Sequence, residues 1–171
     1  MFNDPSKILT FRKIADPYGW LSNMSAHGLK FEGKHYKSAE ALFQSLRFNN
    51  VVIKEHLRLK KSPIKAKMFS KLHQDKMVIE QLGEQDVSNM RMVLKLKLQY
   101  NPELFEMLRE TGDKIIVEDC TNREFKGSLS TLFWGAVLHG EEWFGENTLG
   151  KLWMELREQL PTPEGQQTEL F

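Results

Sequence analysis

Apolar residues recur at helical spacing along most of the chain. Placed 100° apart, residues 38–48 gather Ala39, Leu42 and Phe43 into one stripe, and Ser38 precedes them where an N-cap belongs. Such a stripe is typical of a helix that packs one face against a core. Similar stripes, caps and proline positions predict further helices over residues 51–60, from residue 63, and over residues 86–99, 103–110 and 147–160.

Short alternating or β-branched runs predict strands between these helices. Residues 29–36 alternate about Glu32-Gly33-Lys34 and predict a hairpin. The segment 120–131 is polar and contains glycine, so it predicts a loop. Further short strands are expected over residues 8–11, 115–117, 133–137 and 143–144.

Length and composition are those of one globular domain. The chain has 171 residues, of which 40% are hydrophobic, enough to build a core. No internal repeat or Gly/Pro-rich linker divides it. We therefore expect a single α+β domain over residues 1–160, predominantly helical with short strands, and a disordered tail over residues 161–171.

Charge and cysteine content narrow the class of protein. Lys and Arg total 24 against 23 for Asp and Glu, and this balance disfavours a general nucleic-acid binder or a membrane-surface protein. Cys120 is the single cysteine, and neither a signal peptide nor a transmembrane run is evident, so we expect a cytoplasmic protein. We interpret one lysine patch as a solvated helix face, with nucleic-acid binding as the weaker alternative: Lys60, Lys61, Lys65, Lys67 and Lys71.

Glu40 borders the apolar stripe of its predicted helix instead of lying on the opposite, solvated side. A capping box from Ser38 would place its glutamate at position 41, so capping does not explain Glu40. One interpretation is a boundary carboxylate bonded to Arg47. The other places Glu40 at the edge of a cleft, near a helix N-terminus that favours its charge.

Lys97 projects from the apolar stripe of the 86–99 helix, seven residues after Met90. A lysine in such a position usually extends its charged end to solvent. In a partly dry cleft it would instead act as an anion clamp or as a Schiff-base nucleophile. The pattern leaves these roles open.

Other candidates follow the predicted strands. Asp119 comes just after the 115–117 strand, and is either a functional carboxylate or the cap of a turn. Asn147 and Gly150 surround a helix start, where free N–H groups favour phosphate, although an ordinary N-cap explains them equally well. Neither a zinc-ligand spacing nor a nucleotide-binding glycine pattern is present, so we expect no metal and no cofactor.

Several segments together resemble the NADAR family, which includes the YbiA-like N-glycosidases. The resemblance runs in order to Leu160 and rests on YGWLSNMS (18–25), GKHYKSAEALFQSLRF (33–48), NMRMVLKLKLQYNPEL (89–104), LRETGDKIIVEDCTNR (108–123), FWGA (133–136) and GENTLGKLWMELREQL (145–160). It implies the α+β fold of that family. It also implies hydrolysis of N-glycosidic bonds without a metal.

The resemblance also implies roles for individual residues. Glu40 matches the glutamate before the F-Q pair and Lys97 the lysine late in the N-M helix, so both are expected to be catalytic. Asp119 is the candidate for a further catalytic carboxylate. The residues expected to bind substrate are Asn23, Trp20, Gln44, Arg123, Trp134, Gly135, Asn147 and Gly150.

Two substrate types follow from the resemblance. One is ADP-ribose attached to the amino group of guanine, including guanine in nucleic acid. The other is the phosphoribosylamino pyrimidines or pyrimidinones of riboflavin biosynthesis. Many members carry an aspartate three residues before the W-G pair, whereas this chain has Thr131, which leaves open a module that binds ADP-ribose or a nucleotide without turnover.

Overall fold

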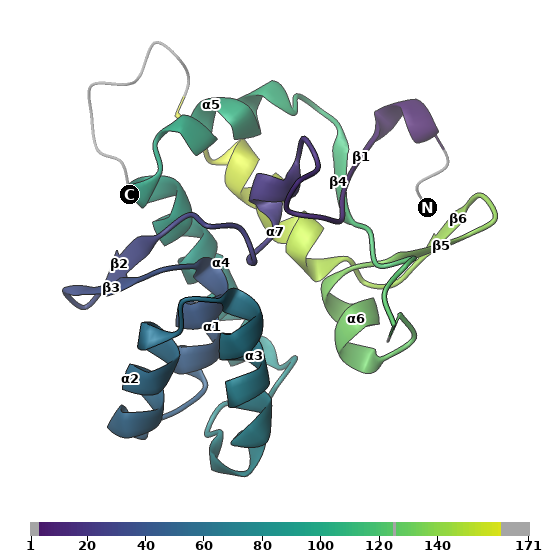
Figure 1. Ribbon diagram of the computed structural model, residues 1–171. Helices are drawn as coiled ribbons and strands as arrows, with labels where there is room; N and C mark the ends of the chain where they lie inside the picture. The colour runs from purple at the N-terminus through teal and green to yellow at the C-terminus, as the bar shows by residue number, and fades with distance from the viewer. Residues whose placement is uncertain (1–3, 125, 162–171) are drawn as a thin grey trace. The chain divides into compact units, whose positions relative to one another are not determined.

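The computed structural model describes residues 4–124 and 126–161 (Figure 1). Contacts within the chain define two compact units, which we call the helical unit (Phe11–Asn101) and the mixed unit (Met1–Thr10 with Pro102–Phe171). Helices and short strands together confirm the predicted α+β class. Of the tail predicted to be disordered, only Pro161 belongs to the described residues.

The helical unit is built around α1, whose apolar stripe is buried as predicted. α1 packs against the three other α-helices of the unit, and α4 also packs against the hairpin strand β2 (Figure 1). Side-chain caps set the starts of three helices: Ser38, Asn50 and Ser62 each accept from a backbone N–H in the first turn that follows. The elements are η2 (Gly19–Leu21), β2 (Leu29–Phe31), β3 (Lys34–Tyr36), α1 (Ala39–Leu46), α2 (Val51–Leu59), α3 (Pro63–Leu72), η3 (Gln74–Lys76) and α4 (Glu84–Tyr100).

The mixed unit pairs its strands in two small sheets. β1 pairs with β4, and β5 and β6 form an antiparallel hairpin in which Val137 lies opposite Phe144. α7 packs against β4 and buries Trp153 and Leu156. The elements are η1 (Pro5–Lys7), β1 (Ile8–Phe11, whose last residue is counted with the helical unit), α5 (Glu103–Glu110), β4 (Ile115–Glu118), α6 (Leu129–Trp134), β5 (Val137–His139), β6 (Glu142–Phe144) and α7 (Thr148–Glu158).

One predicted strand is partly a helix. Residues 133–137 were expected to form a strand, but Phe133 and Trp134 end helix α6, and only Val137 belongs to β5. Ser128 explains the difference, because its hydroxyl accepts from the backbone N–H of Thr131 at 3.2 Å and starts a helix. A local cap here overrides the β preference of the aromatic residues.

The described helices differ in length. Among the residues that the structure describes, α4 is the longest with 17 residues. None of the described helices is long and apolar enough to cross a bilayer.

Candidate active site

Glu40 lies in the first turn of α1 and is only 5% exposed. Its carboxylate accepts a hydrogen bond from the Gln44 side-chain amide at 2.8 Å. The interpretation of Glu40 as an ion-pair partner of Arg47 is therefore wrong. Arg47 instead pairs with Asp86, through Nη2–Oδ2 at 2.6 Å and Nε–Oδ1 at 2.8 Å.

Asn23 is held beside Glu40 by the backbone. The Glu40 N–H donates to the Asn23 carbonyl at 3.2 Å, and the Asn23 side chain is buried. Its Nδ2 contacts the Met90 sulfur at 3.0 Å, a weak acceptor, and its Oδ1 has no hydrogen-bond partner among the described residues. A buried polar atom without a hydrogen-bond partner destabilises the fold by about 1–3 kcal/mol. A further hydrogen-bond donor at the Asn23 Oδ1 atom would therefore be favourable.

Lys97 does not extend to solvent, because its side chain is fully buried. Its ammonium donates to the backbone carbonyls of Trp20 and Ser22, at 2.5 and 2.9 Å, and to the Ser25 hydroxyl at 2.8 Å. These bonds fix the 20–25 loop, which carries Asn23. Snorkelling is thus excluded, whereas the clamp and nucleophile roles stay predictions.

Two physical effects oppose each other at Lys97. Burial lowers its pKa to about 7, so that part of the amine is neutral at neutral pH, as a nucleophile requires. The three acceptors favour the charged form, as an anion clamp requires. Burial and the three acceptors therefore act in opposite directions on the protonation of Lys97.

In the mixed unit the buried carboxylate is Glu118 instead of Asp119. Glu118 pairs with Arg123 at 2.7 Å. Burial, the largest single effect, lowers the pKa of Arg123, but the charge and hydrogen bond of Glu118, together with the nearby Cys120 and Asp119, raise that pKa overall. Asp119 is half-buried and accepts from the Thr121 N–H at 2.9 Å, which is the turn cap considered from the sequence. Its catalytic role stays a prediction.

Asn147 stands before α7 as predicted but does not cap it. Its backbone is left-handed, with φ of 52°, and its buried side chain accepts from Glu118 N at 3.0 Å and donates to Ile116 O at 2.8 Å. Gly150 lets the helix approach the same strand, since an added Cβ would lie 2.1 Å from Ile116 O. The N-x-x-G motif thus clamps α7 to β4.

The remaining predicted residues fall in both units. Trp20 is buried in the helical unit. Trp134 is half-buried at the end of α6, and Gly135 permits a close approach, because an added Cβ would lie 2.5 Å from the Cys120 sulfur. Thr131, at the position of the family aspartate, bonds through its hydroxyl to Ser128 at 2.9 Å.

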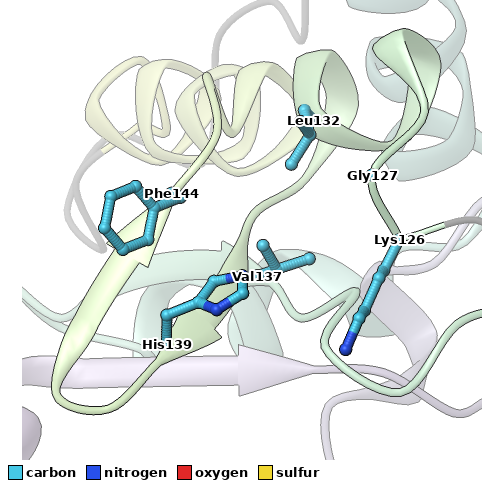
Figure 2. A pocket seen from close by; sticks show the side chains of 6 residues that line it. All are labelled: Lys126, Gly127, Leu132, Val137, His139 and Phe144. Atoms are coloured by element: carbon cyan, nitrogen blue, oxygen red, sulfur yellow. The ribbon is translucent and has the colours of Figure 1, made fainter.

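An open pocket of about 620 Å³ lies in the mixed unit (Figure 2). Figure 2 shows Leu132 of α6 and His139 and Phe144 of the hairpin around it, with Lys126 at its edge. Its lining is apolar apart from Lys126 and His139 and contains none of the predicted site residues. The candidate residues Glu40, Asn23 and Lys97 therefore lie outside the lining of this pocket.

The sequence did not reveal the pairing of Arg47 with Asp86, because 39 positions separate the two residues. It did mark Asp119, but the last three residues of β4 are all buried, so no alternation singles out the neighbouring carboxylate of Glu118. Within the described residues no group of three or more His, Cys, Asp and Glu side chains is placed to share a metal ion.

Comparison with known proteins gives one consistent family. The NADAR domain profile matches residues 10–161. N-glycosidase YbiA of Escherichia coli (strain K12) is 32% identical over 155 residues, which cover 90% of this chain and 88% of that protein. The riboflavin biosynthesis protein PYRR, chloroplastic, of Zea mays is 27% identical over 169 residues, covering 91% of this chain and 25% of that protein.

A solved structure agrees with the sequence comparison. The NMR structure of the E. coli protein YbiA is similar with a TM-score of 0.74 and 31% identity, covering 90% of this chain and 84% of that one. The fold expected from the sequence is therefore confirmed. The profile match over most of the chain and the similarity to YbiA together show that the chain belongs to the NADAR family.

Proposed function

We propose that this chain, a hydrolase that acts on N-glycosyl compounds, removes ADP-ribose from the amino group of ADP-ribosylated guanine without a metal. Its partner is then a modified nucleobase or nucleic acid, and we place the activity in the cytoplasm. The coarser activity has direct support, because the E. coli relative is named an N-glycosidase. The ADP-ribosyl substrate rests on the family resemblance.

One observation carries the proposal: two buried polar residues, Asn23 and Glu40, are joined through their backbones, and the Asn23 side chain has hydrogen-bonding capacity to spare. The Asn23 Oδ1 atom is buried without a partner among the described residues. A ribose hydroxyl is a donor that suits it. A ribose bound there would lie beside the residue that carries the Glu40 carboxylate.

The chemistry that these groups support is hydrolysis through an oxocarbenium-like ribose. The C1′–N bond breaks, and its electron pair stays with the exocyclic nitrogen of guanine, which takes up a proton. Water adds its oxygen to C1′ and releases a proton. We propose that Glu40 stabilises the positive charge at C1′, while Lys97 either clamps an anionic group or attacks C1′ as the neutral amine. In the second case the Lys97–C1′ adduct opens to an imine, and water then adds to C1′ and releases the amine of Lys97.

A separate observation supports the alternative substrate, a phosphoribosylamino pyrimidine. The Zea mays relative is named a riboflavin biosynthesis protein, and its match covers 91% of this chain. A phosphoribosylamino pyrimidine contains the same ribose N-glycoside, so the same groups would act on it. This alternative requires a site that accepts a pyrimidine in place of guanine.

The test offers both substrates to the protein under identical conditions. The chain is incubated with a guanine-ADP-ribosylated oligonucleotide and, separately, with the phosphoribosylamino pyrimidine, each in the presence of EDTA, and products are followed by mass spectrometry. We expect release of ADP-ribose and restoration of unmodified guanine. Release from the pyrimidine alone would favour the second substrate, and binding of ADP-ribose without release from either would reveal a non-catalytic module.

A further inference from the structure

The Arg47 guanidinium contacts four side chains of the helical unit, the fourth being Gln81, whose side-chain oxygen lies 3.4 Å from Nη1. Its guanidinium makes a two-pronged ion pair with the buried Asp86 and lies 4.5 Å from the centre of the Phe43 ring. The third contact runs from Nη1 to the Gln44 side-chain oxygen at 3.2 Å. Arg47 therefore presents a donor to Gln44 in one fixed direction.

The Arg47 donor determines which end of the Gln44 side-chain amide faces it, the oxygen or the nitrogen. A guanidinium can only donate, so the Gln44 atom that faces it must be the oxygen. The amide nitrogen then points the other way and donates to Glu40 at 2.8 Å. The order of hydrogen bonds is thus set by chemistry: Arg47 to Gln44, and Gln44 to Glu40.

The backbone around Asp86 supports the same arrangement. Asp86 lies in the first turn of α4 and also accepts from the Leu82 N–H at 2.9 Å. Leu82 has φ of 66°, a left-handed conformation that a branched residue adopts only when its surroundings hold it there. The loop before α4 is therefore folded tightly around the carboxylate that fixes Arg47.

We propose that Arg47 and Asp86 are positioning residues for Glu40. Their ion pair fixes the Gln44 amide, and the Gln44 amide holds the Glu40 carboxylate in one orientation toward the bound ribose. This inference rests on the proposed function, because it assigns the ion pair a part in turnover. Neither Arg47 nor Asp86 needs to touch substrate.

A purely structural ion pair would behave differently on replacement. Exchanging a buried ion pair for apolar residues of similar volume is often neutral or stabilising. The double variant Arg47→Met/Asp86→Leu therefore keeps the packing and removes the donor to Gln44. If the ion pair only stabilises the fold, turnover should survive this exchange.

The experiment combines three measurements on the full chain: thermal unfolding, kcat and KM on the substrate that the unaltered chain hydrolyses, and hydrogen exchange of the Gln44 side-chain amide by NMR. For the double variant we expect a folded protein with a somewhat lower Tm, because the Leu82 N–H loses its acceptor, together with a kcat lower by about tenfold or more, little change in KM, and faster exchange at Gln44. The control is Gln81→Leu, which removes an outer contact of Arg47 at 3.4 Å and leaves the bond to Gln44. It should keep the normal kcat.

A folded double variant with normal kcat and unchanged exchange at Gln44 would overturn the proposal. If the double variant does not fold, Arg47→Lys replaces it, since lysine keeps the charge opposite Asp86 but lacks the fork that also reaches Gln44. The same loss of kcat is expected from Arg47→Lys, and a normal kcat would again overturn the inference. If the unaltered chain hydrolyses neither substrate, the proposed function is refuted. The effect of Arg47 on Gln44 is still tested in that case, because hydrogen exchange at the Gln44 amide can be compared between the unaltered chain and the double variant.

Discussion

The two units use their buried polar residues in different ways. In the helical unit, buried side chains bond to one another across long stretches of sequence, as Arg47 does to Asp86, and the Asn23 amide keeps an oxygen without a described partner. In the mixed unit, buried polar side chains mostly hold backbone, as Asn147 does for β4. We therefore propose that the chemistry lies in the helical unit and that Asn147, a motif residue of the mixed unit, braces the chain.

The same contrast appears between two residues that match family motifs, Glu40 in the helical unit and Asn147 in the mixed unit. Glu40 and Asn147 both match motif positions and both are buried. Glu40 offers a carboxylate held by one neighbouring side chain, and Asn147 uses its amide to join a helix to a strand. Substitutions that separate turnover from stability therefore test the contrast directly.

The largest effect is expected from Glu40→Gln. The change keeps the shape of the side chain and removes the charge that would stabilise the ribosyl cation, so we expect turnover to fall by at least about a hundredfold. Thermal unfolding should change little. Glu141→Gln, at an exposed turn, is the matched control and should retain full activity. Near-normal turnover in folded Glu40→Gln would show that this carboxylate is only structural.

Lys97→Met should reduce both turnover and stability. Methionine keeps the length of the side chain but leaves the carbonyls of Trp20 and Ser22 without their donor, which should cost about 2 kcal/mol in the free energy of unfolding. The 20–25 loop would loosen, so we also expect turnover to fall by about tenfold or more. Denaturant unfolding and steady-state kinetics measure the two effects.

Borohydride separates the two chemical roles of Lys97. Added during turnover, it should trap the sugar on Lys97 if an imine forms. If no adduct appears, the nucleophile role falls, and the loss of turnover in Lys97→Met is left to the clamp and to the loosened 20–25 loop. If Lys97→Met hydrolyses substrate at the normal rate, both chemical roles fall.

The lowered pKa of Lys97 predicts a pH dependence of stability. With a pKa of about 7 in the folded chain and about 10.4 when unfolded, the unfolded chain binds more protons between these values. The free energy of unfolding should therefore rise with pH from about 7 to about 10, by a few kcal/mol. The increase in the free energy of unfolding with pH should be smaller in Lys97→Met than in the unaltered chain. Equal increases in the two proteins would mean that the carbonyls of Trp20 and Ser22 keep Lys97 charged.

Asn147→Gly tests the bracing role in the mixed unit. Glycine accepts the left-handed backbone but removes both bonds to β4, so we expect a loss of about 2 kcal/mol in the free energy of unfolding. The folded protein should keep its kcat and KM. Asn122→Ala, at an exposed position, is the control and should unfold normally. A raised KM in folded Asn147→Gly would support the substrate-binding role predicted from the family.

The smallest effect is expected from Asp119→Asn. The amide oxygen can still accept from the Thr121 N–H, so stability should change by less than about 0.5 kcal/mol. Turnover should stay within about threefold if the chemistry lies in the helical unit. A large loss of kcat would instead place Asp119 in catalysis, as the sequence predicted.

Local signals accounted for most of the elements. Ser38 and the Ser62-Pro63 pair mark helix starts through bonds within four residues, and the hairpin about Gly33 follows from alternation, so each is visible in sequence. α6 was missed because the Ser128 cap competes with aromatic residues that favour strands. Caps and alternation predict elements well where one local preference is unopposed.

The site was less predictable because its contacts are distant in sequence. Lys97 stands 77 residues from Trp20, and only the folded chain shows that its ammonium is enclosed by carbonyls. Asn147 looks like an ordinary N-cap until its side chain is found on β4, 31 positions away at Ile116. Motifs therefore identified important positions, whereas the physical task of each required the structure.

The most direct test of the account compares Glu40→Gln and Asn147→Gly side by side, measuring Tm and the rate of ADP-ribose release from a guanine-ADP-ribosylated oligonucleotide. We predict an unchanged Tm with turnover reduced at least about a hundredfold for Glu40→Gln. For Asn147→Gly we predict a lower Tm with turnover of the folded protein within about twofold of normal. A folded and active Glu40→Gln protein, or a stable and inactive Asn147→Gly protein, would contradict the assignment of chemistry to the helical unit.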